Sequence, residues 1–100
     1  MLDSNSEGTQ RLRVVVEGHV QGVGFRYFTM DQARRMGLSG WVRNLPSGAV
    51  EAEAEGPRED LLAFLEALTE GPAGSAVRRV RPEWLPASGG DFGFRVRIYD

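Results

Sequence analysis

Apolar and polar residues alternate along the first, third and fifth of five short stretches predicted to be strands, as they do in strands that bury one face. These stretches are Arg11–Glu17, Gly40–Leu45, Ala49–Glu55, Val77–Leu85 and Phe94–Tyr99. In the third, valine and alanine alternate strictly with Glu51, Glu53 and Glu55, which predicts a sheet with one covered face and one wet face. Pro82 interrupts the fourth, and because proline cannot donate to a central ladder, we expect this strand at a sheet edge.

A first helix is predicted over Phe25–Met36, where apolar side chains recur about every third or fourth position. The expected buried stripe is interrupted by Gln32 and consists of Phe25, Phe28, Ala33 and Met36. Gly37 follows directly and is a typical C-terminal stop for a helix.

A second helix is predicted to begin after Gly56. Pro57 suits the first helical position, and Glu59 and Asp60 favour the positive end of the helix. The sequence Gly71-Pro72 then ends the helix. Its core stripe is Leu61, Phe64, Leu65 and Leu68.

The order of elements is β-α-β-β-α-β with a short extra strand, which predicts an α+β, ferredoxin-like sandwich. In this fold an antiparallel sheet carries two helices on one face, and here a short extra C-terminal strand is added. Pro46-Ser47-Gly48 is expected to form a hairpin turn. We assign residues 11–100 to one domain and residues 1–10 to a disordered tail, and we expect Trp41 and Trp84 in the core or at its edge.

Composition narrows the function classes. A net charge of −2 over 100 residues argues against a dedicated nucleic-acid binder, which usually carries a basic surface. Cysteine is absent, which excludes disulfides and thiol nucleophiles, and all twelve basic residues are arginines, which excludes Schiff-base chemistry on lysine. No apolar run is long enough to span a bilayer, and the N-terminus lacks the apolar core of a signal peptide, so we expect a cytoplasmic protein without membrane contact.

The stretch Gly18–Gly24 holds three glycines and lies between a predicted strand and the start of a helix. Free N–H groups converge at such a helix end and the helix dipole is positive there, so a curled loop can bind a phosphate. Arg26, in the first helical turn, can fold back onto the anion. Taken alone, the same residues also fit a tight turn followed by a surface arginine, and the lysine of a nucleotide-binding P-loop is missing.

Asn44 stands near the end of the second predicted strand, just before the turn. Asparagine in this position is common turn chemistry. The ferredoxin-like arrangement, however, brings the end of this strand close to the exit of the first strand, where a side-chain amide can hold a water near a bound phosphate.

These stretches together resemble a known family. The segment Gly18-His19-Val20-Gln21-Gly22-Val23-Gly24-Phe25-Arg26 closely resembles the phosphate-loop signature of acylphosphatases. The segments Gly40-Trp41-Val42-Arg43-Asn44 and Gly48-Ala49-Val50-Glu51 resemble that family's second signature, and the likeness extends over about residues 11–99. The resemblance implies hydrolysis of acyl phosphates without cofactor or metal. By position it implies that Arg26 is the catalytic, phosphate-binding arginine and that Asn44 orients the attacking water.

The resemblance also implies which main-chain groups cradle the phosphate, namely the amides of Val20, Gln21, Gly22, Val23, Gly24 and Phe25. Two positions beside the site depart from the commonest family version. Leu45 stands where many members have a small hydroxylic residue, and the turn reads Pro46-Ser47-Gly48. Neither departure removes a residue to which the resemblance assigns a role.

The residue types suit this chemistry. An acyl phosphate loses a carboxylate whose pKa lies at about 4–5, so the leaving group needs no general acid. Phosphoryl transfer then requires mainly positioning and charge stabilisation, which loop amides and one arginine supply. His19 is the only histidine, and we expect it to be an exposed loop residue without a catalytic role.

Two other readings stay open at this point. A ferredoxin-like domain can be a non-catalytic anion-binding or RNA-binding module. Three glutamates on the third strand would repel the phosphate backbone of RNA. We interpret Arg78, Arg79 and Arg81 as solvated residues whose charges offset those of the glutamates. Alternatively, the chain is a carbamoyl-phosphate-handling domain of a larger protein. Because the sequence ends at Asp100, we expect instead a small monomeric enzyme whose partners are an acyl phosphate and inorganic phosphate, with no nucleic acid.

Overall fold

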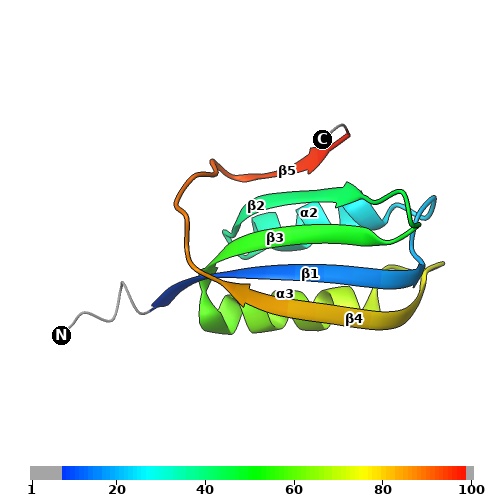
Figure 1. Ribbon diagram of the computed structural model, residues 1–100, viewed down its shortest axis with the longest axis horizontal. Helices are drawn as coiled ribbons and strands as arrows, with labels where there is room; N and C mark the ends of the chain where they lie inside the picture. The colour runs from blue at the N-terminus through cyan, green and yellow to red at the C-terminus, as the bar shows by residue number, and fades with distance from the viewer. Residues whose placement is uncertain (1–7, 99–100) are drawn as a thin grey trace.

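The computed structural model describes residues 8–98, which form one sheet with two helices behind it (Figure 1). The elements in chain order are β1 (Thr9–His19), α2 (Phe25–Arg35), β2 (Ser39–Asn44), β3 (Val50–Pro57), α3 (Arg58–Glu70), β4 (Ala76–Leu85) and β5 (Phe94–Arg97). The order of elements and the placement of both helices on one face confirm the predicted ferredoxin-like fold.

The sheet has the strand order β4-β1-β3-β2-β5. Neighbouring strands are antiparallel except at one edge, where β5 pairs parallel with β2 and Val96 lies opposite Val42. The expected antiparallel sheet therefore describes the first four strands, and the extra strand makes the sheet mixed. β4 occupies the other edge, as Pro82 predicted.

Each strand differs from its predicted bounds by one or two residues at one end or both, and the first and last strands show why. β1 begins at Thr9, where the chain pairs with Pro57, so Thr9 and Gln10 belong to the strand and not to the tail. Gly8 precedes the strand, and residues 1–7 of the predicted tail lie outside the described residues. β5 ends at Arg97, and Ile98, predicted as part of this strand, is exposed; Tyr99 lies outside the described residues.

The core lies between the sheet and the two helices. Leu12, Val14 and Val16 of β1 point into it and are fully buried. Phe64 of α3 and Phe94 of β5 meet edge to face with ring centroids 6.0 Å apart, which ties the last strand to the helical layer. Of the predicted helix stripes, the members that are buried are Phe25, Ala33, Leu61, Phe64 and Leu68, whereas Phe28, Met36 and Leu65 are only partly buried.

Both helices end next to the glycines that were predicted to end them. Gly37 and Gly71 follow α2 and α3 with φ of 71° and 72°, a backbone conformation that favours glycine. Pro57 differs slightly from its predicted place: it precedes the first helical residue of α3 as the N-cap. In α2, Thr29 is fully buried, and its hydroxyl is satisfied because it donates to the carbonyl oxygen of Phe25 at 2.9 Å.

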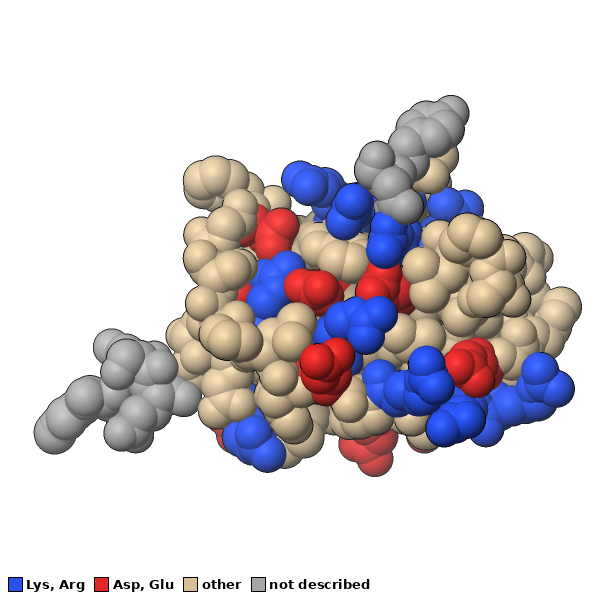
Figure 2. Space-filling model, in the orientation of Figure 1, with Lys and Arg blue, Asp and Glu red and all other residues tan. Residues whose placement is uncertain are grey.

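The expectation of a wet outer sheet face was wrong for two of the three glutamates on β3. Glu51 and Glu55 are only 4% and 7% exposed. Glu51 accepts hydrogen bonds from Arg13 at 2.6 Å and Arg43 at 2.7 Å, and their charges compensate its burial. Acidic and basic side chains are accordingly interleaved over this face (Figure 2).

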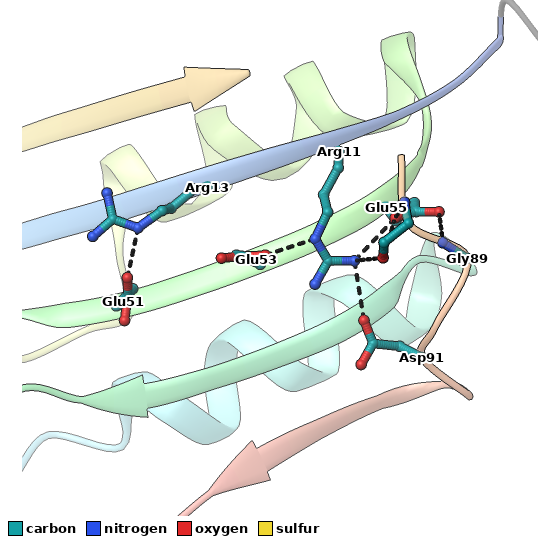
Figure 3. A network of polar contacts seen from close by, with 8 residues as sticks. Arg11, Arg13, Glu51, Glu53, Glu55, Gly89 and Asp91 are labelled. Atoms are coloured by element: carbon teal, nitrogen blue, oxygen red, sulfur yellow. Dashed lines mark hydrogen bonds and ion pairs between the residues drawn. The ribbon is translucent and has the colours of Figure 1, made fainter. Parts of the chain in front are cut away.

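Glu55 belongs to a second cluster that holds the connection between β4 and β5 against the sheet (Figure 3). Its carboxylate accepts the backbone N–H of Ser88 at 2.9 Å and that of Gly89 at 2.8 Å. Arg11 bridges Glu55 at 2.9 Å, and also Glu53 and Asp91. The segment that crosses to the far sheet edge is therefore fixed by a buried charge cluster.

The pKa values of two carboxyls reflect these contacts. Burial alone raises the pKa of Glu51, but the hydrogen bonds from Arg43 and Arg13 outweigh it and leave the pKa below its ordinary value of 4.5. For Glu55, burial likewise raises the pKa, and the backbone N–H of Ser88 together with Arg11 and Gly89 lowers it overall.

We therefore expect acid to destabilise the fold. Because the pKa values of Glu51 and Glu55 are lowered on folding, their stabilisation is present above 4.5 and is lost as the pH falls through the folded-state values. Glu51→Gln should lower the free energy of unfolding at neutral pH by about 1.5–3 kcal/mol and flatten its acid dependence. Urea unfolding between neutral and acid pH measures both effects. Exposed Glu66 on α3 provides the matched control, and equal curves for Glu51→Gln and Glu66→Gln would contradict the expectation.

The predictions for Trp84, Trp41 and the arginines of β4 also need correction. Trp84 is 39% exposed and packs under the Arg58 guanidinium at 4.3 Å instead of in the core. Trp41 is half-buried beneath Arg97 at 4.6 Å, on the sheet face away from the helices. The arginines of β4 do not offset the glutamates of β3: within residues 8–98, the one ion pair made by Arg78, Arg79 or Arg81 joins Arg81 to Glu17 at 3.7 Å.

Candidate active site

A pocket of about 170 Å³ lies where the loop between β1 and α2 meets the end of β2. Figure 1 shows this loop beside the turn that joins β2 and β3. The pocket is lined by Val20, Gln21, Gly22, Gly24, Phe25, Arg26, Tyr27 and Asn44. The structure therefore brings together the glycine loop, the arginine and the asparagine that the sequence placed in two separate motifs.

The loop backbone has positive φ at two glycines and leaves a run of amides without internal partners among residues 8–98. Gly22 and Gly24 both have φ of 77°, which strongly favours glycine, although a side chain would have space at either position. The backbone N–H groups of residues 21–26 donate to no acceptor among the described residues. A row of free N–H groups in such a turn forms a concave anion site.

The N-terminus of α2 reinforces this site. Gly24 precedes the helix without a side-chain cap, and no acidic residue stands in the first turn. The start of α3 differs, because its first turn carries Glu59 and Asp60. The partial positive charge of the α2 terminus is thus left for an external anion.

Gly18 shapes the entry into the loop for a different reason. The register of β1 against β4 shifts between Glu17 and Gly18, and the φ of Gly18 is 134°. A Cβ atom at this position would overlap the carbonyl oxygen of Ala76. Glycine is required here because the two backbones approach closely where β1 turns into the loop.

Arg26 lies in the first turn of α2 and lines the pocket. Its side chain is half-buried, and no carboxylate among residues 8–98 lies within ion-pair distance of its guanidinium. Arg11, Arg13 and Arg43, by contrast, are held by the carboxylates of Glu51 and Glu55. Arg26 therefore offers a planar, doubly donating group to an anion in the pocket.

Asn44 is the last residue of β2 and pairs with Val50 across the hairpin. It is half-buried, and its side-chain amide makes no hydrogen bond within the described part of the chain. Because the strand ends at the pocket wall, the amide can donate to and accept from a molecule held there.

The prediction from sequence missed two features of this pocket. Tyr27 lines it and is 58% exposed; its position directly after Arg26 in the first helical turn is the signal that points to it. The side chain of Gln21 bonds to the hairpin, a contact that no local pattern shows. Val23, whose backbone amide is predicted to belong to the cradle, is not among the lining residues, and its side chain packs partly buried against the core. His19 is exposed and lies outside the lining, as expected, although it is the last residue of β1 and not part of the loop.

Charge is distributed unevenly over the surface. Although the whole chain carries a net charge of −2, basic side chains gather along the two sheet edges in Figure 2. Within residues 8–98, no three His, Cys, Asp or Glu side chains group in a way that suits a metal ion. Among the same residues, no helix is long and apolar enough to cross a membrane.

Comparison with known proteins identifies the family. Residues 12–96 match the family described as Acylphosphatase. The chain is 47% identical over 91 residues to an acylphosphatase from Salinibacter ruber, covering 90% of this chain and 96% of the relative. The chain belongs to the acylphosphatase family. The structure of an acylphosphatase from Coxiella burnetii is similar, with a TM-score of 0.86 at 37% identity, and covers 96% of this chain and 100% of that one.

A larger protein also contains a similar domain. The structure of HypF from T. kodakarensis matches 91% of this acylphosphatase with a TM-score of 0.79 at 34% identity, but the match spans only 12% of HypF. The match to the Salinibacter relative is higher in identity and extends over nearly all of that protein. These matches favour an acylphosphatase enzyme over a domain that serves a larger protein.

Proposed function

We propose that this acylphosphatase hydrolyses acyl phosphates without a metal, by holding the phosphoryl group in the 20–25 loop with Arg26 and aligning a water with Asn44. The observation that supports this most directly is the pocket itself. It joins a row of free N–H groups, an arginine without an acidic partner and an unpaired side-chain amide within the described residues. These groups are complementary to a phosphoryl dianion and its attacking water.

In the proposed mechanism, the loop amides and Arg26 bind the non-bridging oxygens of the phosphoryl group. Negative charge on these oxygens is stabilised in the transition state by donors that are already in place. The Asn44 amide accepts a hydrogen bond from the water and orients its oxygen toward phosphorus, opposite the acyl oxygen. The new bond joins water oxygen to phosphorus.

Bond cleavage completes the step. The bond between phosphorus and the acyl oxygen breaks, and the carboxylate leaves with the electron pair. An amide is too weak a base to take the proton of the water, so this proton passes to a phosphoryl oxygen. The products are a carboxylate and inorganic phosphate, and no enzyme side chain changes its protonation state.

A comparison of two leaving groups tests this function. Benzoyl phosphate loses a carboxylate of low pKa, whereas phenyl phosphate loses a phenolate of pKa about 10, which ordinarily needs acid catalysis or a metal. In excess EDTA we expect rapid hydrolysis of benzoyl phosphate and no detectable hydrolysis of phenyl phosphate. Equal rates, or a loss of activity in EDTA, would contradict the mechanism.

A substitution of His19 should have little effect on activity. The imidazole is exposed and lies outside the pocket lining, and the mechanism contains no general acid or base. His19→Ala should retain the turnover number and the shape of the pH–rate profile for benzoyl phosphate. A large loss of turnover in folded His19→Ala would show that the mechanism omits a proton transfer.

We also propose that the enzyme acts as a monomer in the cytoplasm, with an acyl phosphate and inorganic phosphate as its small-molecule partners and with neither nucleic acid nor membrane. The acidic composition supports the absence of nucleic acid. The paired glutamates of β3 stand where RNA-binding sheets of this fold display stacking aromatics. Light scattering of the purified protein tests whether it is a monomer. A shift assay with single-stranded RNA tests whether it binds nucleic acid.

A further inference from the structure

The side chain of Gln21 leaves the phosphate loop and holds the turn between β2 and β3. Its Nε2 donates to the carbonyl oxygen of Leu45 at 2.8 Å and to that of Ala49 at 2.9 Å. Both partners are carbonyl oxygens, which only accept, so the NH₂ group must face them and both of its protons are used. The side chain is half-buried at this junction.

The two carbonyls flank Asn44. Leu45 follows Asn44 directly, and Ala49 precedes Val50, the partner of Asn44 across the hairpin. The same carbonyls also close the turn, since the Leu45 N–H donates to Ala49 at 2.8 Å and the Gly48 N–H donates to Leu45 at 3.0 Å. The Gln21 amide is therefore attached to the part of the hairpin that fixes the end of β2.

No other hydrogen bond joins the loop to this hairpin. Within the described residues, the two Gln21 bonds are the only ones between residues 20–24 and 44–50. Both acceptors belong to the main chain, so the anchor is independent of the side chains at positions 45–48, where this chain departs from the commonest family pattern. The sheet pairs Val16 of β1 with Val50 and Val50 with Asn44, and beyond these strands one side chain makes the hydrogen bonds that hold the loop itself to the hairpin.

We propose that Gln21 is a positioning residue that sets the distance between the phosphate cradle and the side-chain amide of Asn44. The inference rests on the proposed function, because it assumes that the loop binds phosphate and that Asn44 aligns the water. In-line attack requires a bound phosphoryl group and an aligned water at the same time. A misplacement of a reacting group by about 1 Å can cost on the order of 10²-fold in rate. In this role the side chain of Gln21 does not touch the reacting atoms, whereas its backbone amide remains part of the proposed cradle.

The first test removes the anchor without adding charge. Methionine is similar in length to glutamine but cannot donate, so Gln21→Met releases the loop from the hairpin. We expect kcat for benzoyl phosphate to fall about 10- to 100-fold, while competitive inhibition by inorganic phosphate is nearly unchanged, because the loop amides and Arg26 remain. The matched control is Gln32→Met, on α2 outside the pocket lining. Wild-type kcat in folded Gln21→Met would overturn the inference.

A double-mutant cycle distinguishes positioning from a general loss of structure. If Gln21 acts through Asn44, then Gln21→Met in an Asn44→Ala background should lower kcat much less than it does in the wild type. Equal fold-losses in the two backgrounds would overturn the inference. The proposed function has a separate test in the same cycle: if Asn44→Ala alone retains full turnover, the role of Asn44 fails, whatever Gln21 does.

A second variant applies if Gln21→Met does not fold. Gln21→Glu preserves the shape but places a carboxylate against two carbonyl oxygens, which favours the protonated form of the introduced group. Once protonated, this group donates one of the two lost hydrogen bonds. The ratio of Gln21→Glu to wild-type kcat should therefore rise as the pH is lowered from neutral, and a flat ratio would overturn the inference.

Discussion

Arg26→Ala should lower kcat/KM for benzoyl phosphate by at least about 10²–10³-fold, the scale of removing one preorganised donor from a transition-state site. The effect is expected to be large because, within residues 8–98, no acidic partner occupies this guanidinium, so substrate is its main interaction. Inorganic phosphate should also inhibit the variant more weakly, since the same group binds the ground-state anion. Initial rates and inhibition constants measure both effects.

Two further variants serve as controls for Arg26. Arg35 lies on the same helix, and its guanidinium pairs with Asp31 at 3.0 Å on the exposed side, so Arg35→Ala should retain activity. Arg26→Lys preserves the charge but loses the planar pair of donors, and should recover only part of the rate. Near-normal activity in folded Arg26→Ala would show that the loop amides alone bind the phosphoryl group.

Asn44→Ala should affect turnover and not anion binding. The amide is proposed to orient water, so its loss should reduce kcat by about 10²-fold or more, on the scale of misplacing a reacting group. Inhibition by inorganic phosphate should be preserved, because the cradle and Arg26 are unchanged. Ser47→Ala, in the same hairpin but outside the pocket lining, is the matched control.

Two other results for Asn44→Ala would contradict the proposed role of its amide. Weaker phosphate inhibition with unchanged kcat would place its amide on the phosphoryl group instead of the water. A parallel loss in both would indicate a collapsed hairpin, and the melting temperature of Asn44→Ala would reveal this independently. Only a selective fall in kcat agrees with the proposed role.

Local chemistry explains why much of the fold was predictable. Gly37 and Gly71 end their helices because the positive φ that each adopts favours glycine strongly over other residues. Pro82 marks an edge strand because it lacks a donor. The parallel pairing of β5 was not predicted, because it depends on a connection that crosses to the far sheet edge, and periodicity within four residues carries no information about a neighbour.

The main error of the sequence-based prediction was to expect solvated glutamates on β3, because their partners depend on the register of strand pairing. Glutamates that alternate with alanine look like a solvated face, but Glu51 finds Arg13 across 38 residues of sequence. Such a partner becomes visible only when the strand pairing is known, since Arg13 lies opposite Glu53 on the neighbouring strand. Three arginines close to one another in sequence, on β4, were therefore assigned a role that belongs to Arg11, Arg13 and Arg43.

In the candidate site, too, local motifs were predictable and contacts between distant segments were not. Gly22, Gly24, Arg26 and Asn44 were predicted because each belongs to a compact motif, and the fold brings these motifs together at one pocket. Gln21 belongs to the first motif as well, but its anchor reaches main-chain carbonyls of the second. A contact between a side chain and a distant backbone leaves no pattern in sequence.

The position of bond formation is the most direct test of the central proposal, which places an aligned water at phosphorus. Hydrolysis of benzoyl phosphate in H₂¹⁸O, followed by mass spectrometry of both products, reports where the solvent oxygen enters. The mechanism predicts one heavy oxygen in inorganic phosphate and none in benzoate. Label in benzoate would mean that water attacks the acyl carbon, and a pocket built around the phosphoryl group would then have a different function.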